Sequence, residues 1–251
     1  MNTSRKILAL AAGLLGLVTA ASANTLVLNT NPYSNGSNGG SYTISNFGAG
    51  LTTSSYSNKV STATSFETFC MEPTEYFSPG STYDYTLAPY AYGGANEAAV
   101  RNIGTGDHLS KGTSYLYSQF AQGILSGYTY TLSTAKKTSN LYLQQAFWYL
   151  EDDYTLTGSQ AMSNTFLVQV AQLFGGGTIT SSNIISKLEY ARANATDGAY
   201  GVWAVNITSN HGQTQNQSQL YYHNVPEAAS TVALLGLALL GLVGLRRKSA
   251  K

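Results

Sequence analysis

The sequence LYLQQAFWYL at residues 141–150 has apolar side chains three and four positions apart. This spacing predicts an α-helix with one face in the core, because each residue turns about 100° around the helix axis. The core face holds Leu143, Ala146, Phe147 and Leu150, and Leu141 and Trp148 widen it on one side. Gln144 falls inside the widened face, whereas Gln145 points toward the polar side. A buried amide without partners costs about 1–3 kcal/mol, so Gln144 needs a structural or chemical reason to be there.

Similar spacing at residues 114–125, 139–150 and 160–174 predicts three helices, and residues 184–193 are expected to form a further one. Strands are predicted on both sides of this helical region, and glycines 175–177 interrupt it. The predicted strands are residues 25–28, 41–47, 65–71, 200–208 and 220–222. This order indicates an α+β fold, in which a helical segment is inserted into a β-sandwich or barrel-like framework.

The N-terminal residues 1–23 have the pattern of a cleavable signal peptide. Arg5 and Lys6 precede an apolar run at residues 7–18, and Ala21 and Ala23 form the small-x-small pattern that signal peptidase accepts. We therefore expect an exported body at residues 24–224 that begins at Asn24.

The C-terminal residues 225–251 have the pattern of a membrane-inserted tail. A helix over residues 228–245 would be about 27 Å long, enough to cross a bilayer core that thins slightly. The basic residues Arg246, Arg247 and Lys248 follow it and would remain cytoplasmic as a stop-transfer signal. The sequence therefore predicts a single transmembrane helix that anchors the protein at least transiently.

This tail resembles the PEP-CTERM sorting signals, which exosortases process in Gram-negative bacteria. The resemblance rests on Val225, Pro226 and Glu227, the Leu/Gly/Ala-rich span and the arginines after it; Ala228 stands where a second proline is usual. It implies cleavage near the motif by an exosortase-like enzyme. The body would then be released or attached to the cell surface.

The body is poor in charge and rich in tyrosine. Only 10% of the chain is charged, against about 25% in ordinary globular proteins. The body has four more acidic than basic residues, which disfavours nucleic-acid binding because that function needs a basic surface. No phosphate loop or zinc-spaced Cys/His set is present, so no cofactor or metal is expected. The acidic run at residues 151–153 follows a predicted helix, and we expect it to be solvated.

Cys70 is the one cysteine of the chain. In an exported protein a single cysteine has no internal disulfide partner, so it is buried and inert, free and reactive, or bonded to another group. Phe69 and Met71 beside it favour burial, since a free cysteine packs as a small apolar side chain.

Phe69-Cys70 together with Gln144-Gln145-Ala146-Phe147-Trp148 resembles the thioester domains of bacterial adhesins. In those domains a strand cysteine preceded by Phe or Tyr is cross-linked to a glutamine of a Gln-x-Ala-apolar-Trp helix. The resemblance implies a thioester between Cys70 and Gln144, shielded from water by Phe69, Phe147 and Trp148. Such a bond would wait for an amine or hydroxyl nucleophile on a partner and then capture it.

These observations predict a non-enzymatic envelope or matrix protein, used for adhesion or for association with exopolysaccharide. Two alternatives remain open. An extracellular carbohydrate-active enzyme would need two carboxylates facing one another across a cleft, for which Glu72, Glu75 and the acidic run at residues 151–153 are candidates. A lectin would use exposed tyrosines to contact sugars.

Overall fold

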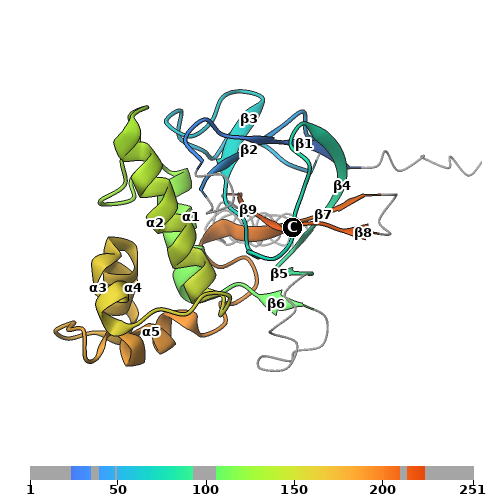
Figure 1. The fold of residues 1–251 in the computed structure, drawn as a ribbon. Coiled ribbons are helices and arrows are strands. Elements are labelled where there is room, and N and C mark those ends of the chain that lie inside the picture. Colours follow the sequence, from blue (N-terminus) through green and yellow to red (C-terminus); the bar gives the residue numbers. More distant parts are fainter. Residues whose placement is uncertain (1–23, 35–39, 49, 93–105, 210–213, 224–251) are drawn as a thin grey trace, which may run out of the picture.

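A curled antiparallel sheet is the framework of the molecule (Figure 1). The computed structural model describes residues 24–34, 40–48, 50–92, 106–209 and 214–223. Within these residues the main sheet contains seven strands in the order β3-β2-β1-β4-β7-β8, with β9 also paired to β7. They are β1 (Thr25–Thr30), β2 (Tyr42–Ser45), β3 (Ser65–Thr68), β4 (Ser81–Ala88), β7 (Val202–Ser209), β8 (Thr214–Gln215) and β9 (Gln219–Tyr222). A separate pair joins β5 (Tyr90–Ala91) to β6 (Asp107–His108).

Alternation of side chains explains why one face of the sheet is buried. Successive residues of a strand point to opposite faces, so apolar residues two apart gather on one side. The register places Leu28 opposite Ile44 and Ile44 opposite Phe66, and all three are at most 1% exposed. Burial of each such side chain contributes about 1.5–3 kcal/mol, so this row fixes the register of β1, β2 and β3.

The predicted α+β class is confirmed, and the framework is one antiparallel sheet that is not closed into a barrel in the described residues. The main sheet is a single antiparallel sheet that curls until its β3 end approaches β9. In the described residues no ladder closes it into a barrel. The contact there consists of a bridge between Cys70 and Gln219 and the main-chain hydrogen bonds around it. A sequence shows which strands are half-buried but not whether a sheet curls or pairs with a second sheet.

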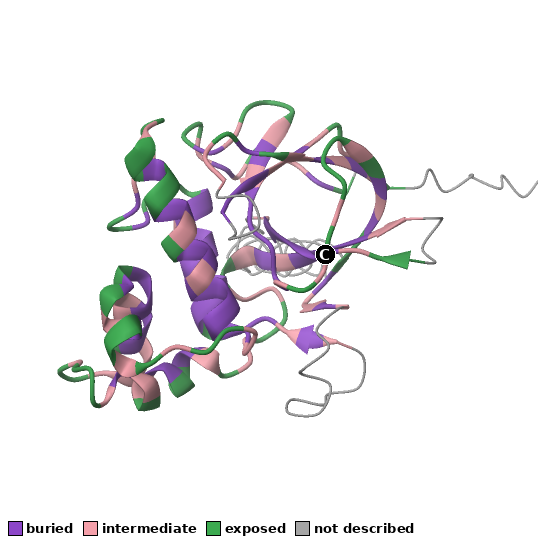
Figure 2. Cartoon of the chain, viewed as in Figure 1, coloured by how far each residue is buried: buried purple, intermediate pink, exposed green. Residues whose placement is uncertain are grey.

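The helices gather on one side of the sheet, and α1 packs against β7 and β9 (Figure 1). They are α1 (Lys111–Ala121), α2 (Thr134–Leu150), α3 (Gly158–Ser163), α4 (Thr165–Gly175) and α5 (Ile184–Arg192), and the 3₁₀ turn η2 (Ala199–Gly201) follows. The C-terminal half of α2 is the more buried half (Figure 2), which agrees with the predicted core face. The helix predicted at residues 160–174 is two helices. Asn164 ends α3 and caps α4 by accepting hydrogen bonds from the amides of Phe166 and Leu167.

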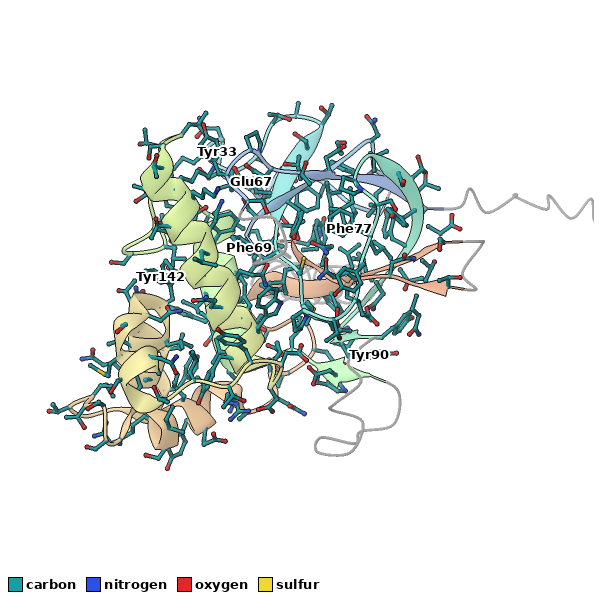
Figure 3. The ribbon with its side chains drawn as sticks, in the orientation of Figure 1. Tyr33, Glu67, Phe69, Phe77, Tyr90 and Tyr142 are labelled. Carbon is teal, nitrogen blue, oxygen red and sulfur yellow. The ribbon has the colours of Figure 1, made fainter. Side chains whose placement is uncertain are left out.

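A buried ion pair joins α2 to β3. The Nζ atom of Lys136 lies 2.5 Å from Oε1 of Glu67, and the Lys136 side chain is fully buried. Its charge also lies 5.6 Å from the centre of the Tyr33 ring. Figure 3 labels Tyr33 and Glu67 beside the first turns of α2. This contact holds the N-terminal half of α2 against the sheet.

Both terminal predictions lie outside the described residues. These are the signal peptide at residues 1–23, with Ala21 and Ala23, and the tail at residues 225–251, with its helix at residues 228–245. Among the residues that the structure describes, no helix has the length and apolar character needed to cross a membrane.

Candidate functional site

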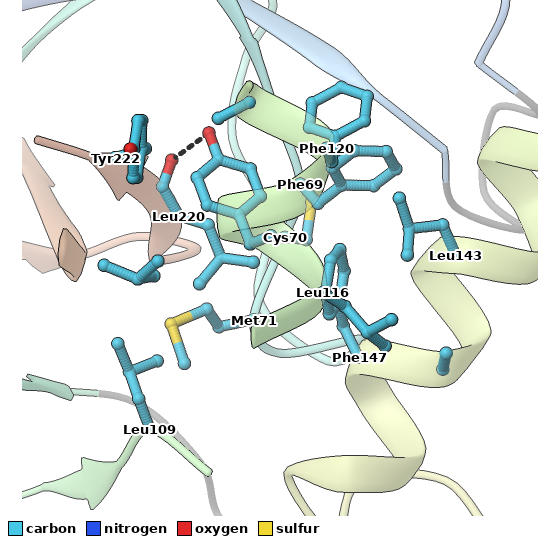
Figure 4. Close-up of a cluster of buried hydrophobic side chains, with 14 of the residues drawn as sticks. Phe69, Cys70, Met71, Leu109, Leu116, Phe120, Leu143, Phe147, Leu220 and Tyr222 are labelled. Atoms are coloured by element: carbon cyan, nitrogen blue, oxygen red, sulfur yellow. Dashed lines mark hydrogen bonds between the residues drawn. The ribbon is translucent and has the colours of Figure 1, made fainter. Parts of the chain in front are cut away.

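Cys70 lies in the centre of the core, directly after β3. Its side chain is fully buried. The main chain on either side of it is held by β9, because the amide of Leu220 donates to the Phe69 carbonyl and the amide of Met71 donates to the Ser218 carbonyl. Figure 4 shows Phe69, Phe120 and Phe147 gathered around this position. The ring centres of Phe120 and Phe147 lie 5.1 Å and 5.2 Å from that of Phe69, so aromatic side chains separate this part of the core from solvent.

Gln144 is buried as its helical position predicted, and it reaches Cys70. Its side-chain amide contacts the main chain of Cys70 and not the sulfur atom: Oε1 accepts from the Cys70 amide at 3.1 Å, and Nε2 donates to the Cys70 carbonyl at 2.7 Å. Both polar atoms of the buried Gln144 side chain therefore have partners, which removes the cost of burying them. The contact fixes the Cys70 main chain against α2.

The amide that reaches the sulfur atom is that of Gln217, just before β9. Sγ of Cys70 donates to Oε1 of Gln217 at 2.7 Å, and Nε2 of Gln217 donates to the Glu72 carbonyl at 2.5 Å. Nε2 of Gln219 lies 3.5 Å from the same sulfur. Residues 217 and 219 are two apart in an extended segment, so their side chains leave it on the same face. The prediction from sequence did not include Gln217 or Gln219.

The environment of Cys70 favours the neutral thiol. Burial raises the pKa of Cys70 well above its ordinary value, since the thiolate would lose its solvation. A neutral buried thiol is a poor nucleophile toward reagents in solution. Any reaction of this sulfur is therefore restricted to the groups already in contact with it.

The three residues predicted to shield a thioester fall in two places. Phe69 and Phe147 pack together next to Cys70, as described above. Trp148 lines a cavity of about 230 Å³ on another side of the site, and Gln217 also lines it. The cavity reaches the surface near Tyr76, which is 78% exposed. The structure thus places the Gln217 side chain between the buried sulfur and a pocket that opens outward.

Carboxylates gather around the same region, contrary to the prediction that residues 151–153 are solvated. Glu151 is 1% exposed. Burial, with a smaller contribution from the charge of Asp107, raises the pKa of Glu151 to about 7 and that of Asp153 to about 7. Burial and the charges of Glu75 and Asp153 also raise the pKa of Glu72. Within the described residues no group of three or more His, Cys, Asp or Glu side chains has the arrangement needed to hold a metal ion.

We expect the free energy of unfolding to fall as the pH rises from about 5 to about 8. The pKa of Glu151 is about 7 in the folded protein, above the ordinary glutamate value of 4.5. The folded state therefore binds this proton more tightly, and the stabilisation is full below about pH 4 and lost as the pH passes about 7. For this one group the change is about 3 kcal/mol.

Urea denaturation at the two pH values measures this difference, and Glu151→Gln should reduce it. Glu189→Gln on α5 is the control, because the Glu189 side chain is 58% exposed. This variant should leave the pH dependence of the free energy of unfolding unchanged. An unaltered pH dependence in Glu151→Gln would show that another group is responsible.

The tail predicted from sequence has a counterpart among known protein families. Residues 224–249 match the VPDSG-CTERM motif. The match includes Val225, Pro226 and Glu227, the apolar span after them, and Arg246 and Arg247. Searches of the curated proteins and of the solved structures found no match. The chain therefore carries a C-terminal sorting motif, which suggests an exported, envelope-targeted protein whose tail is processed by a sorting enzyme.

Proposed function

We propose that the exported body forms an internal thioester between Cys70 and Gln217, and that this bond attaches the protein covalently to a partner at the cell surface. The sulfur atom attacks the side-chain carbonyl carbon of Gln217, the carbon–nitrogen bond breaks, and the thiol proton leaves with the nitrogen as ammonia. The product is a thioester held inside the protein. No oxidant or cofactor is needed.

The 2.7 Å contact between Sγ of Cys70 and Oε1 of Gln217 is the observation that carries this proposal. Because a carbonyl bond is about 1.23 Å long, the carbon that would be attacked lies within about 4 Å of the sulfur. Reacting atoms held at such short range avoid most of the entropic cost of bringing them together. Hydrogen bonds from Gln217 to Glu72 and from Gln144 to the Cys70 main chain hold both reactants in place.

Gln217 replaces Gln144 in this proposal because of where each amide lies. Gln144 is engaged at both ends by the Cys70 main chain, so its carbonyl is not presented to the sulfur. Its role would be to position Cys70. Phe69 and Phe147 retain the shielding role that the sequence predicted, since water near the thioester would hydrolyse it.

The sorting motif supports a surface location for such a bond. A thioester stores an electrophile until an amine or hydroxyl group arrives, and the product is a covalent amide or ester. A protein targeted to the envelope by its tail could use it for adhesion or for attachment to extracellular polymers. The partner's identity would be set by the pocket beside Gln217.

Capture of a small amine tests the proposed function. The purified protein is incubated with methylamine and digested, and the peptides are identified by mass spectrometry. We expect methylamide on Gln217 together with a newly free thiol at Cys70, and no adduct in Cys70→Ala. An unmodified Gln217 peptide, together with a Cys70 thiol that is fully titratable in the unfolded but untreated protein, would contradict the proposal.

A further inference from the structure

The pocket beside Gln217 has a composition that restricts what can reach the proposed thioester. Its volume is about 230 Å³. Its wall includes the rings of Tyr42, Tyr76, Phe77 and Trp148, together with Glu75 and Gln217. Aromatic rings and prolines make up most of this wall, and Glu75 is its one ionisable carboxylate.

The apolar wall of this pocket is built from well-packed rings. The Tyr42 and Phe77 rings meet edge to face, with their centres 4.9 Å apart. Trp148 comes from α2 and is 7% exposed. Ring faces attract cations, and rings and prolines together suit the methylene groups of an alkyl chain. A strongly hydrated anion would gain little from such a wall.

The buried polar atoms of the pocket that lack a hydrogen-bond partner among the described residues include Oε2 of Glu75 and Nε1 of Trp148. A buried carboxylate oxygen without a donor is costly, and a bound ammonium group would supply that donor. Burial also raises the pKa of Glu75, so this carboxylate holds a proton more readily than one in water. Glu75 is therefore suited both to bind a cationic amine and to accept its proton.

We propose that this pocket admits an unbranched primary alkylammonium group and that Glu75 selects it by binding its charge and removing its proton. The inference rests on the proposed thioester between Cys70 and Gln217. The ammonium transfers one proton to the Glu75 carboxylate, and the neutral amine attacks the carbonyl carbon of Gln217. The carbon–sulfur bond breaks, an amide forms, and the second amine proton ends on the Cys70 sulfur as a thiol.

The rate of amine capture in Glu75→Gln tests this role. Wild-type protein and variant are incubated with butylamine, which is cationic at neutral pH, or with hydroxylamine, which is uncharged there. Intact mass reports each adduct. We expect Glu75→Gln to slow capture of butylamine at least about tenfold and to leave the rate with hydroxylamine nearly unchanged. Asp197→Asn is the matched control, because Asp197 is 66% exposed and does not line the pocket.

Equal rates of butylamine capture in wild type and Glu75→Gln would overturn the inference while leaving the thioester intact. Equal slowing with both reagents would overturn it as well, since Glu75 would then support the fold or the bond itself. Absence of any adduct with hydroxylamine in the wild type would instead contradict the proposed function.

A second arm distinguishes a free small amine from a lysine side chain as the source of the ammonium group. A short lysine peptide is compared with the same peptide acetylated on the lysine Nε. Capture of only the unmodified peptide would assign the pocket to lysines of a partner protein. If butylamine is captured and neither peptide is, the pocket would be assigned to small free amines.

Discussion

Replacing Gln217 by Ala is expected to abolish amine capture and to leave Cys70 as a free thiol. The variant lacks the carbonyl carbon that the sulfur attacks. Among the described residues no other side-chain carbonyl lies at the same distance, since Gln219 contacts the sulfur through its nitrogen at 3.5 Å. Its intact mass should show no loss of ammonia. Peptide mapping after treatment with methylamine should find neither a modified glutamine nor a blocked cysteine.

Gln144→Ala is the matched comparison, because Gln144 is the partner that the sequence predicted. It removes the two hydrogen bonds to the Cys70 main chain and leaves two buried main-chain groups without partners, at about 1–3 kcal/mol each. We expect a clearly lower melting temperature, with the folded protein still capturing amine at Gln217. Retained capture in Gln217→Ala with loss in Gln144→Ala would assign the bond to Gln144.

Glu67→Gln is expected to destabilise the protein by about 3–5 kcal/mol, the largest stability effect that we predict. The variant leaves the fully buried ammonium of Lys136 without its counter-charge, and an uncompensated buried charge is far costlier than a missing pair. Urea denaturation measures the free energy of unfolding.

The double replacement Glu67→Leu with Lys136→Met provides the control for this ion pair. Apolar groups of similar size avoid the desolvation of both charges, so we expect a stability close to that of the wild type. A loss below about 1 kcal/mol in Glu67→Gln alone would mean that Lys136 reaches water when its partner is removed.

The sequence predicted local structure correctly where the spacing of apolar residues matched one type of secondary structure. The three-and-four spacing of residues 141–150 placed Gln144 on the buried face of α2 and Gln145 away from it, and the structure confirms both positions. The strand β4 was missed although Tyr83 and Tyr85 alternate with Asp84 and Thr86. That alternation was a usable signal for a strand, because the two tyrosines lie on its buried face and the polar residues lie on the other face.

The site required tertiary information that no local pattern holds. Gln217 lies 147 positions from Cys70, and its segment, Asn216-Gln217-Ser218-Gln219, has the composition of a loop. Burial of this polar stretch follows from the neighbouring main chain, which pairs Cys70 with Gln219. The sequence offered one hint of this site. Gln217 and Gln219 lie two positions apart and lead into the apolar strand at residues 220–222.

Glu151 also shows that local sequence does not determine burial. A carboxylate at the end of a helix is usually solvated, and the sequence favoured that interpretation. In the folded protein the amide of Ser110 donates to Oε1 of Glu151, and the residue is buried beneath the start of α1. Packing from a distant element therefore decides the charge state of this residue.

The intact mass of the mature protein tests the central claim most directly. The account predicts a mass lower, by that of one ammonia molecule, than the value calculated from the processed sequence, and this difference should vanish in Cys70→Ala after allowance for the substitution. A wild-type mass equal to the calculated value, in protein never exposed to amines, would contradict it.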